Sequence, residues 1–146
     1  MYDLCDPIMK PITIIFVDDH PLIRKAWAFI LNNDPRFELV ATCESGEEAI
    51  EKSYQLCPDI VIMDIRLRGI SGIQATQLIR ENCPDCKIIG LSFHSQPEHA
   101  QEIIEKGARG YLTKLSHPEE IFRAIIEVHN GKSYICRDMA GKLVIS

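Results

Sequence analysis

Side chains that could bind a cation and a phosphoryl group stand at the ends of four apolar runs of the sequence. They are three carboxylates, a hydroxyl and an ammonium group: Asp18, Asp19, Asp64, Ser92 and Lys114. Carboxylates that lie close together repel, so either one of them keeps a proton or a cation neutralises them. Oxygen ligands with open coordination positions suit Mg²⁺, which keeps several waters and shares itself with phosphoryl groups. The residue types therefore indicate a magnesium site at which a carboxylate could accept phosphate as an acyl phosphate.

Each of these residues also has an ordinary structural interpretation. Asp19 could cap the helix that follows it, and Asp64 could close a strand before a turn. Ser92 and Lys114 could be solvated loop residues. Their coincidence at the same end of neighbouring strands favours a shared site, in which Mg²⁺ and Lys114 would neutralise the charge of a transferring phosphoryl group.

The elements that must position these residues are five short apolar runs that read as strands. They cover residues 12–17, 37–43, 59–64, 87–92 and 110–113. Three of them are continuous rather than alternating, which is typical of strands covered on both faces of a parallel sheet. Segments with helical spacing lie between them, which indicates right-handed crossovers. We predict an α/β fold, a doubly wound (βα)5 parallel sheet of five strands in the order 2-1-3-4-5, with its ligand beyond the carboxyl ends of the strands.

The helix starts are marked by Ser-x-x-Glu/Gln sequences, in which the two side chains can satisfy the first amides of a helix. Four such boxes occur, at residues 45–48, 71–74, 95–98 and 116–119. The helix predicted over residues 20–33 has no box. Its predicted buried stripe consists of Leu22, Ile23, Ala26, Phe29 and Ile30, with Trp27 packed beside it.

The composition limits the classes of function. With 146 residues, 46% hydrophobic and 25% charged, the chain is predicted to form one domain with one sizeable core. A net charge of -5 argues against binding of nucleic acid or an anionic membrane by this chain alone. No apolar run approaches the roughly 20 residues that span a bilayer, and the first ten residues lack the layout of a signal peptide. A cytoplasmic location is therefore expected.

The cysteines and histidines indicate no further chemistry. Cys83 and Cys86 form the only close pair of the six cysteines, in a turn before a strand, and we interpret them as reduced and structural. The histidines lack metal-ligand spacing and are interpreted as surface or cap residues: His20, His94, His99, His117 and His129.

Taken together, the motifs resemble the receiver domain of two-component response regulators. The resemblance covers about residues 11–131 and rests on VDDH, DIVIMDIRLRGISG, GLSFH and GARGYLTK. It implies that Asp64 accepts phosphate from a sensor histidine kinase. It also implies that Mg²⁺ is held by Asp64, by Asp19 directly, by Asp18 largely through water, and by the backbone carbonyl of Arg66.

The same resemblance assigns a switch. Lys114 would grip the phosphoryl group and Ser92 would turn to hydrogen-bond it. Tyr111, three residues before the lysine, would turn inward as Ser92 moves. The helix before Tyr111, the strand that carries it and the helix after it would form the face that carries the signal.

The motifs DDHPLIRKA and GARGYLTK further resemble the NarL/FixJ branch, whose members carry a LuxR-type helix-turn-helix domain. We therefore predict an N-terminal extension (1–10), a receiver domain (11–131) and the start of a linker or C-terminal tail (132–146), with the effector domain absent from this chain. The resemblance implies a homodimer on phosphorylation, DNA contact only through the missing domain and no membrane partner. The alternative is a stand-alone receiver that passes phosphate on or docks a partner.

Several positions depart from the family pattern. Arg68 and Leu115 stand where the family usually has proline, and Phe93 stands where it usually has a small residue. Phe93 could screen the phosphoryl pocket, while Arg66 and His94 occupy positions that tune hydrolysis of the acyl phosphate. We predict slow dephosphorylation.

Two other functions compete with a phosphorylation switch. A small Mg²⁺-dependent phosphohydrolase would also use an aspartyl phosphate, but many such enzymes carry a second aspartate where this chain has Arg66. A pseudo-receiver would bind partners without taking phosphate; the complete set of site residues argues against it, and Phe93 leaves it open. We expect no enzyme activity beyond the chain's own phosphorylation and dephosphorylation.

Overall fold

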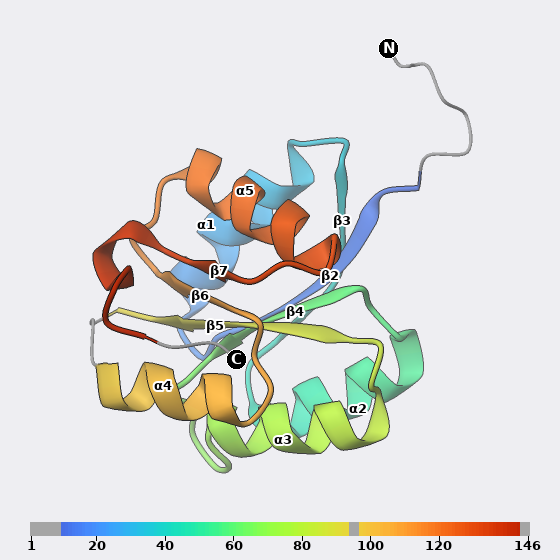
Figure 1. The fold of residues 1–146 in the computed structure, drawn as a ribbon. Helices are drawn as coiled ribbons and strands as arrows, with labels where there is room; N and C mark the ends of the chain where they lie inside the picture. Colours follow the sequence, from blue (N-terminus) through green and yellow to red (C-terminus); the bar gives the residue numbers. More distant parts are fainter. Residues whose placement is uncertain (1–9, 94–96, 144–146) are drawn as a thin grey trace.

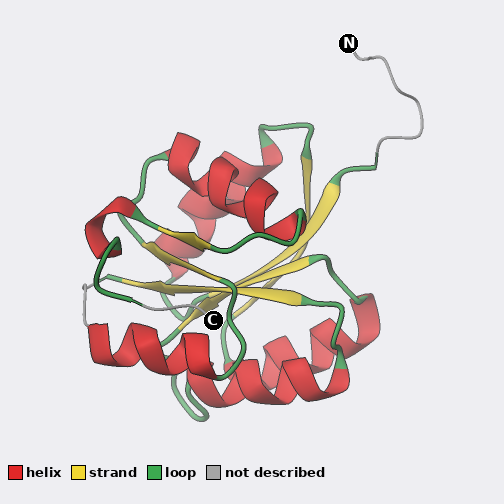
Figure 2. Cartoon of the chain, viewed as in Figure 1, coloured by secondary structure: helices red, strands yellow, loops and turns green. Residues whose placement is uncertain are grey.

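The computed structural model describes residues 10–93 and 97–143. Figure 1 and Figure 2 show alternating strands and helices along the chain. The strands are β2 (Ile12–Val17), β3 (Phe37–Cys43), β4 (Ile60–Asp64), β5 (Lys87–Ser92), β6 (Gly110–Thr113) and β7 (Tyr134–Ile135). The helices are α1 (Pro21–Asn32), α2 (Gly46–Leu56), α3 (Gly72–Asn82), α4 (Pro97–Glu105) and α5 (Pro118–His129), followed by the 3-10 turn η1 (Arg137–Met139).

The sheet is parallel throughout, with the strand order β3-β2-β4-β5-β6-β7. Helices α1 and α5 cover one face, and α2, α3 and α4 cover the other (Figure 1). All five residues of β4 are buried, as expected for a central strand covered on both sides. Within the described residues, no helix has the length and apolar character needed to cross a membrane.

The predicted order of the first five strands is confirmed, but the prediction of five strands was wrong by one. The sixth strand, β7, pairs with β6 through Gly110 opposite Tyr134 and Tyr111 opposite Ile135. Two residues are too few to show a hydrophobic period, and this strand forms because β6 offers it an open edge. The domain boundaries remain a prediction; within residues 132–146, Tyr134 and Ile135 join the sheet, and Cys136 and Met139 are buried.

The predicted buried stripe of α1 was rotated from the observed one. Leu22 and Phe29 are 79% and 71% exposed, whereas Trp27 and Leu31 are buried. The Trp27 ring stacks on Phe16 of β2 with centroids 4.9 Å apart. Because apolar residues surround much of this helix, its largest side chain decides which face turns to the core.

The helix caps follow the serine boxes in part. Ser45 accepts a hydrogen bond from the amide of Glu48, and Ser71 forms a complete capping box with Gln74. The box predicted at Ser116 is wrong, because its hydroxyl accepts from the Thr113 amide and α5 begins one residue later, after His117. The box predicted at residues 95–98 begins outside the described residues.

Candidate metal and phosphoryl site

The carboxyl ends of four neighbouring strands, β2, β4, β5 and β6, bring the predicted residues together. Asp64 is the last residue of β4, between β2 and β5. Asp18 follows β2, and its amide donates to the Cys43 carbonyl at 3.0 Å. Lys114 follows β6, and its amide donates to the Ser92 carbonyl at 2.8 Å. The sheet register therefore fixes the backbone positions from which these side chains reach one another.

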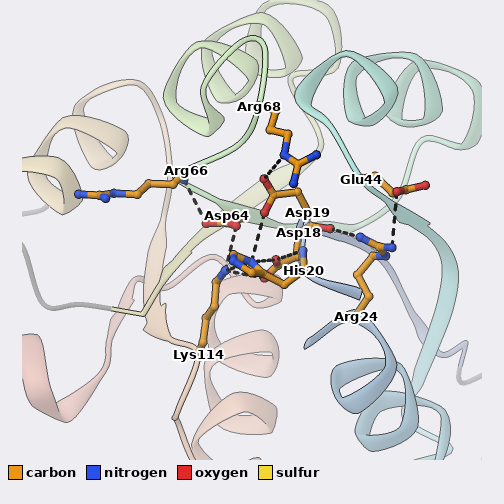
Figure 3. Close-up of polar contacts among 9 residues, drawn as sticks. All are labelled: Asp18, Asp19, His20, Arg24, Glu44, Asp64, Arg66, Arg68 and Lys114. Atoms are coloured by element: carbon orange, nitrogen blue, oxygen red, sulfur yellow. Dashed lines mark hydrogen bonds and ion pairs between the residues drawn. The ribbon is translucent and has the colours of Figure 1, made fainter. Parts of the chain in front are cut away.

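Lys114 reaches the carboxylates with its ammonium end (Figure 3). Its Nζ is 2.8 Å from Oδ2 of Asp18 and 2.9 Å from Oδ2 of Asp64. All three side chains are at most 2% exposed. One buried ammonium thus faces two buried carboxylates, which leaves an excess of negative charge in a region with little water.

Burial and the neighbouring charges together shift the pKa of Asp64 upward. Burial raises the pKa of Asp64 from 3.8 to about 6; the hydrogen bond from Lys114 opposes this rise, and the charge of Asp18 adds to it. Oδ2 of Asp18 is buried and, within the described residues, accepts no well-aligned hydrogen bond even though Lys114 forms an ion pair with it. The site therefore offers a carboxylate oxygen that a cation could satisfy.

The donor set fits a hard divalent cation. One ligand atom each from Asp18, Asp19, His20 and Asp64 lies within 4.8 Å of the others. Carboxylate oxygens are the ligands that Mg²⁺ prefers, and their negative charge favours its binding. Oδ1 of Asp64 also accepts a hydrogen bond from the amide of Arg66 at 3.1 Å, and the Arg66 side chain extends away from the carboxylates (Figure 3). The role of the Arg66 carbonyl stays a prediction.

His20 belongs to this cluster, although the sequence placed it only at the surface or at a cap. It is the residue before α1, but its side chain makes no cap. Instead its Nδ1 lies 2.7 Å from Asp18 Oδ1, 3.2 Å from Asp19 Oδ1 and 3.2 Å from Lys114 Nζ. The sequence signal that could have assigned His20 to the site is its position directly after two aspartates.

Two arginines flank the paired aspartates. Arg24, on α1, donates to the Asp18 carbonyl at 2.7 Å and lies 3.6 Å from the Glu44 carboxylate, so it ties the end of β2 to α1. Arg68 is 91% exposed, and its Nε lies 4.0 Å from Asp19 Oδ2. Such an exposed pair contributes little, so Asp19 can turn toward a cation at low cost.

The loop after Asp64 is held tightly by a glycine. A Cβ on Gly72 would lie 1.9 Å from the Asp64 carbonyl oxygen and 2.9 Å from the Ile65 Cα. The Gly72 amide donates to the Ile65 carbonyl at 2.9 Å. The first residue of α3 therefore packs directly on the backbone of Asp64 and Ile65, and only glycine fits there.

Ser92 and Tyr111 are also in contact. Their hydroxyl groups are hydrogen-bonded to each other, and Tyr111 is fully buried. Burial raises the pKa of Tyr111, although the hydrogen bond to Ser92 opposes the rise. The two predicted switch residues thus lie together, with Tyr111 turned inward; their roles stay predictions.

Phe93 covers the site from the solvent side. The Lys114 Nζ lies 4.6 Å from the centre of the Phe93 ring, and the His20 ring packs edge-on against it at 5.5 Å. Phe93 is 39% exposed. Leu115, which directly follows Lys114 and also departs from the family pattern, is 78% exposed. An aromatic ring seated on the ammonium shields it from water.

The sequence of this chain is similar to those of known proteins. The family model described as the response regulator receiver domain matches residues 14–126. Response regulator UvrY of Escherichia coli (strain K12) is 34% identical over 135 residues, covering 92% of this chain and 62% of UvrY. Transcriptional regulatory protein DegU of Brevibacillus brevis is 36% identical over 124 residues, covering 85% of this chain and 52% of DegU. The chain thus spans less than two thirds of these relatives.

A solved structure shows the same fold. The two-component response regulator of the LuxR family from Aurantimonas sp. SI85-9A1 superposes with a TM-score of 0.86 at 33% identity. The match covers 91% of this chain and 95% of that one.

Proposed function

Since this chain belongs to the family of response regulator receiver domains, and its relatives to the LuxR branch, we propose that it accepts a phosphoryl group on Asp64 and thereby switches its output face. The observation that carries this proposal is the buried Lys114, whose ammonium bridges Asp18 and Asp64 at the carboxyl end of the sheet. A purely structural domain would gain nothing from burying three charges there, since each is costly to remove from water.

The proposed donor is a phosphohistidine of a sensor histidine kinase. An oxygen of Asp64 attacks phosphorus, the phosphorus–nitrogen bond breaks, and its electron pair returns to the imidazole. The amide of Arg66 holds Oδ1 of Asp64, and Lys114 on Oδ2 is placed to follow the charge onto a phosphoryl oxygen. Asp18, Asp19, Asp64 and the Arg66 carbonyl would hold Mg²⁺, which supplies positive charge against the phosphoryl oxygens.

The same relatives suggest how phosphorylation would be converted into a signal. Ser92 would leave Tyr111 to hydrogen-bond the phosphoryl group, and this would alter the face formed by α4, β6 and α5. One relative is named a transcriptional regulatory protein and one a LuxR-family response regulator, which supports control of an attached DNA-binding domain. We propose in addition that the chain dimerises on phosphorylation and acts in the cytoplasm. A stand-alone receiver would use the same chemistry and differ only in what docks on that face.

The competing functions are separated by the fate of the phosphoryl group. A phosphohydrolase would need a general acid or base beside the nucleophile, and the residue two positions on is Arg66, whose side chain points away from Asp64 in Figure 3. A pseudo-receiver would take no phosphate at all. The proposed switch requires a stable acyl phosphate on this chain.

Intact mass after incubation with acetyl phosphate tests the proposal. We expect the wild-type chain to gain one phosphoryl group with Mg²⁺ and none with EDTA, and the adduct to be lost on treatment with hydroxylamine. If no adduct forms and no beryllofluoride binds in the presence of Mg²⁺, the chain is a pseudo-receiver. Continuous release of phosphate without an adduct would favour the phosphohydrolase.

The position of Phe93 predicts slow loss of the phosphoryl group. Because its ring contacts Lys114 and His20, we expect it to hinder the approach of water to the acyl phosphate. We expect Phe93→Ala to shorten the lifetime of the acyl phosphate by roughly threefold to tenfold, up to about 1.4 kcal/mol in the barrier. The measurement is phosphate release from purified phosphorylated protein.

Two variants control this experiment. Phe93→Leu keeps apolar bulk over the ammonium and should retain a lifetime close to that of the wild type. Phe29→Ala removes an exposed ring on α1 and should have no effect. Equal lifetimes for the wild type and Phe93→Ala would show that the ring does not control access of water.

A further inference from the structure

The C-terminal segment of the described chain is bound to the strand that carries Tyr111. We call residues 134–139, which form β7 and η1, the clasp. The Tyr134 amide donates to the Arg109 carbonyl at 3.1 Å, and the Cys136 amide donates to the Tyr111 carbonyl at 3.0 Å. Figure 1 shows β7 lying along β6, where it forms the edge of the sheet. The clasp therefore covers the open edge of β6.

A single carboxylate on α5 anchors the clasp. Oε2 of Glu120 accepts a hydrogen bond from the Tyr134 hydroxyl at 3.0 Å and from the Arg137 amide at 2.9 Å. Burial, with the hydrogen bond to Glu120, raises the pKa of Tyr134 to about 12, so this hydroxyl remains a donor at neutral pH. One side chain thus holds the end of β7 and the first residue of η1.

The clasp is also paired with Tyr111. Cys136 is 1% exposed and Met139 is fully buried, so the segment closes over the core next to β6. Ile135 of the clasp lies opposite Tyr111 in the register of β6 and β7, and the Tyr111 hydroxyl is hydrogen-bonded to Ser92. Tyr111 is therefore tied to the clasp through its backbone and to a residue of the predicted phosphoryl site through its side chain.

We propose that the clasp holds Tyr111 in its buried position, and that docking of the clasp and phosphorylation of Asp64 favour each other. The second part rests on the proposed function, in which the inward position of Tyr111 belongs to the phosphorylated state. Coupling of this kind is reciprocal: if the clasp promotes the state that binds a phosphoryl group, the phosphoryl group tightens the clasp to the same degree.

The packing around the clasp allows it to open. An open cleft of about 500 Å³ separates it from the start of α5 and is lined by Leu115, His117, Glu119, Arg123, Tyr134 and Arg137. Apolar packing does not seal this side, so the two hydrogen bonds to Glu120 hold the clasp to α5, while its backbone hydrogen bonds hold it to β6. Loss of that carboxylate should loosen the clasp while its pairing with β6 remains.

Hydrogen exchange of the wild type, Glu120→Ala and the control Glu119→Ala tests the clasp. Glu119 is exposed on the same turn of α5, and the two hydrogen bonds that hold the clasp go to Glu120. We expect exchange of residues 134–139 to rise about tenfold in Glu120→Ala. Nitration of Tyr111 by tetranitromethane, mapped by mass spectrometry, should rise with it. Tyr134→Phe removes one of the two bonds and should show a smaller change in the same direction.

Binding of beryllofluoride with Mg²⁺ tests the coupling. We expect beryllofluoride to slow exchange of the clasp in the wild type, and Glu120→Ala to bind it about fivefold more weakly than Glu119→Ala. Equal affinities, with a loosened clasp, would overturn the coupling while leaving the phosphorylation switch intact. No binding to the wild type would refute the proposed function and the coupling with it. Unchanged nitration of Tyr111 in a loosened Glu120→Ala would overturn the claim that the clasp holds this side chain, and that measurement needs neither metal nor phosphate.

Discussion

Replacement of Asp64 by asparagine is expected to abolish phosphorylation and to make the metal-free protein more stable above pH 7. The first effect follows because an amide cannot form the acyl phosphate. The second follows from the burial of Asp64, whose carboxylate lies beside that of Asp18 and shares one ammonium with it. Asparagine removes one of these charges and keeps an oxygen that can accept a hydrogen bond from the Arg66 amide.

The sign of the pH dependence follows from the raised pKa of Asp64. The unfolded chain loses this proton near pH 3.8, whereas the folded chain keeps it until about pH 6. The folded state therefore binds more protons between these values, and the stability of the wild type falls as pH rises through this range. A rise of about two units corresponds to a penalty on the order of 3 kcal/mol at pH 8, which bound Mg²⁺ would offset.

We expect Asp64→Asn to unfold in urea with a free energy about 1–2 kcal/mol higher than the wild type at pH 8 in EDTA. This gain in stability is smaller than the cost of burying the charged carboxylate, because the amide of asparagine pairs less well with Lys114 than the carboxylate does. At pH 5 the two proteins should differ less, and Mg²⁺ should stabilise only the wild type strongly. If Asp64→Asn were less stable than the wild type at pH 8, burial of the charged Asp64 carboxylate would not destabilise the folded state.

The sequence predicted the backbone of this site better than its side chains. Continuous apolar runs and short turns predict parallel strands, and in parallel sheets the carboxyl ends meet at one edge. For that reason Asp64 and Lys114, fifty residues apart, could be placed together, and their side chains are 2.9 Å apart. Their chemical roles remain predictions, since position alone does not show phosphate transfer.

The features that the sequence did not predict depend on tertiary contacts. His20 turns Nδ1 toward Asp18 and Asp19 and packs its ring edge-on against Phe93, and no local pattern encodes the contact with Phe93. The strand β7 exists only where β6 presents an edge. In α1, packing of Trp27 on Phe16 decided the buried face among several apolar residues.

Replacement of Lys114 by methionine is expected to destabilise the metal-free protein strongly at pH 8. The variant keeps the apolar stem but leaves the carboxylates of Asp18 and Asp64 buried without their shared ammonium. Breaking a buried ion pair from one side typically costs about 3–5 kcal/mol, because the remaining charge is uncompensated. The measurement is urea unfolding at pH 8 in EDTA, with the exposed Lys25→Met as the matched control.

Two further comparisons separate loss of charge from loss of packing. The destabilisation should shrink at pH 5, because without Lys114 the pKa of Asp64 rises further and the carboxylate takes up a proton on folding. Adding Asp18→Asn to Lys114→Met should restore much of the stability, because the double variant buries one carboxylate and so has the same net charge at this cluster as the wild type, which buries two carboxylates and one ammonium. Loss of stability that is independent of pH and unaffected by Asp18→Asn would instead mean that the lysine stem, and not its charge, supports the fold. In that case Lys114 could not be assigned the role of neutralising the carboxylates at which phosphate is proposed to bind.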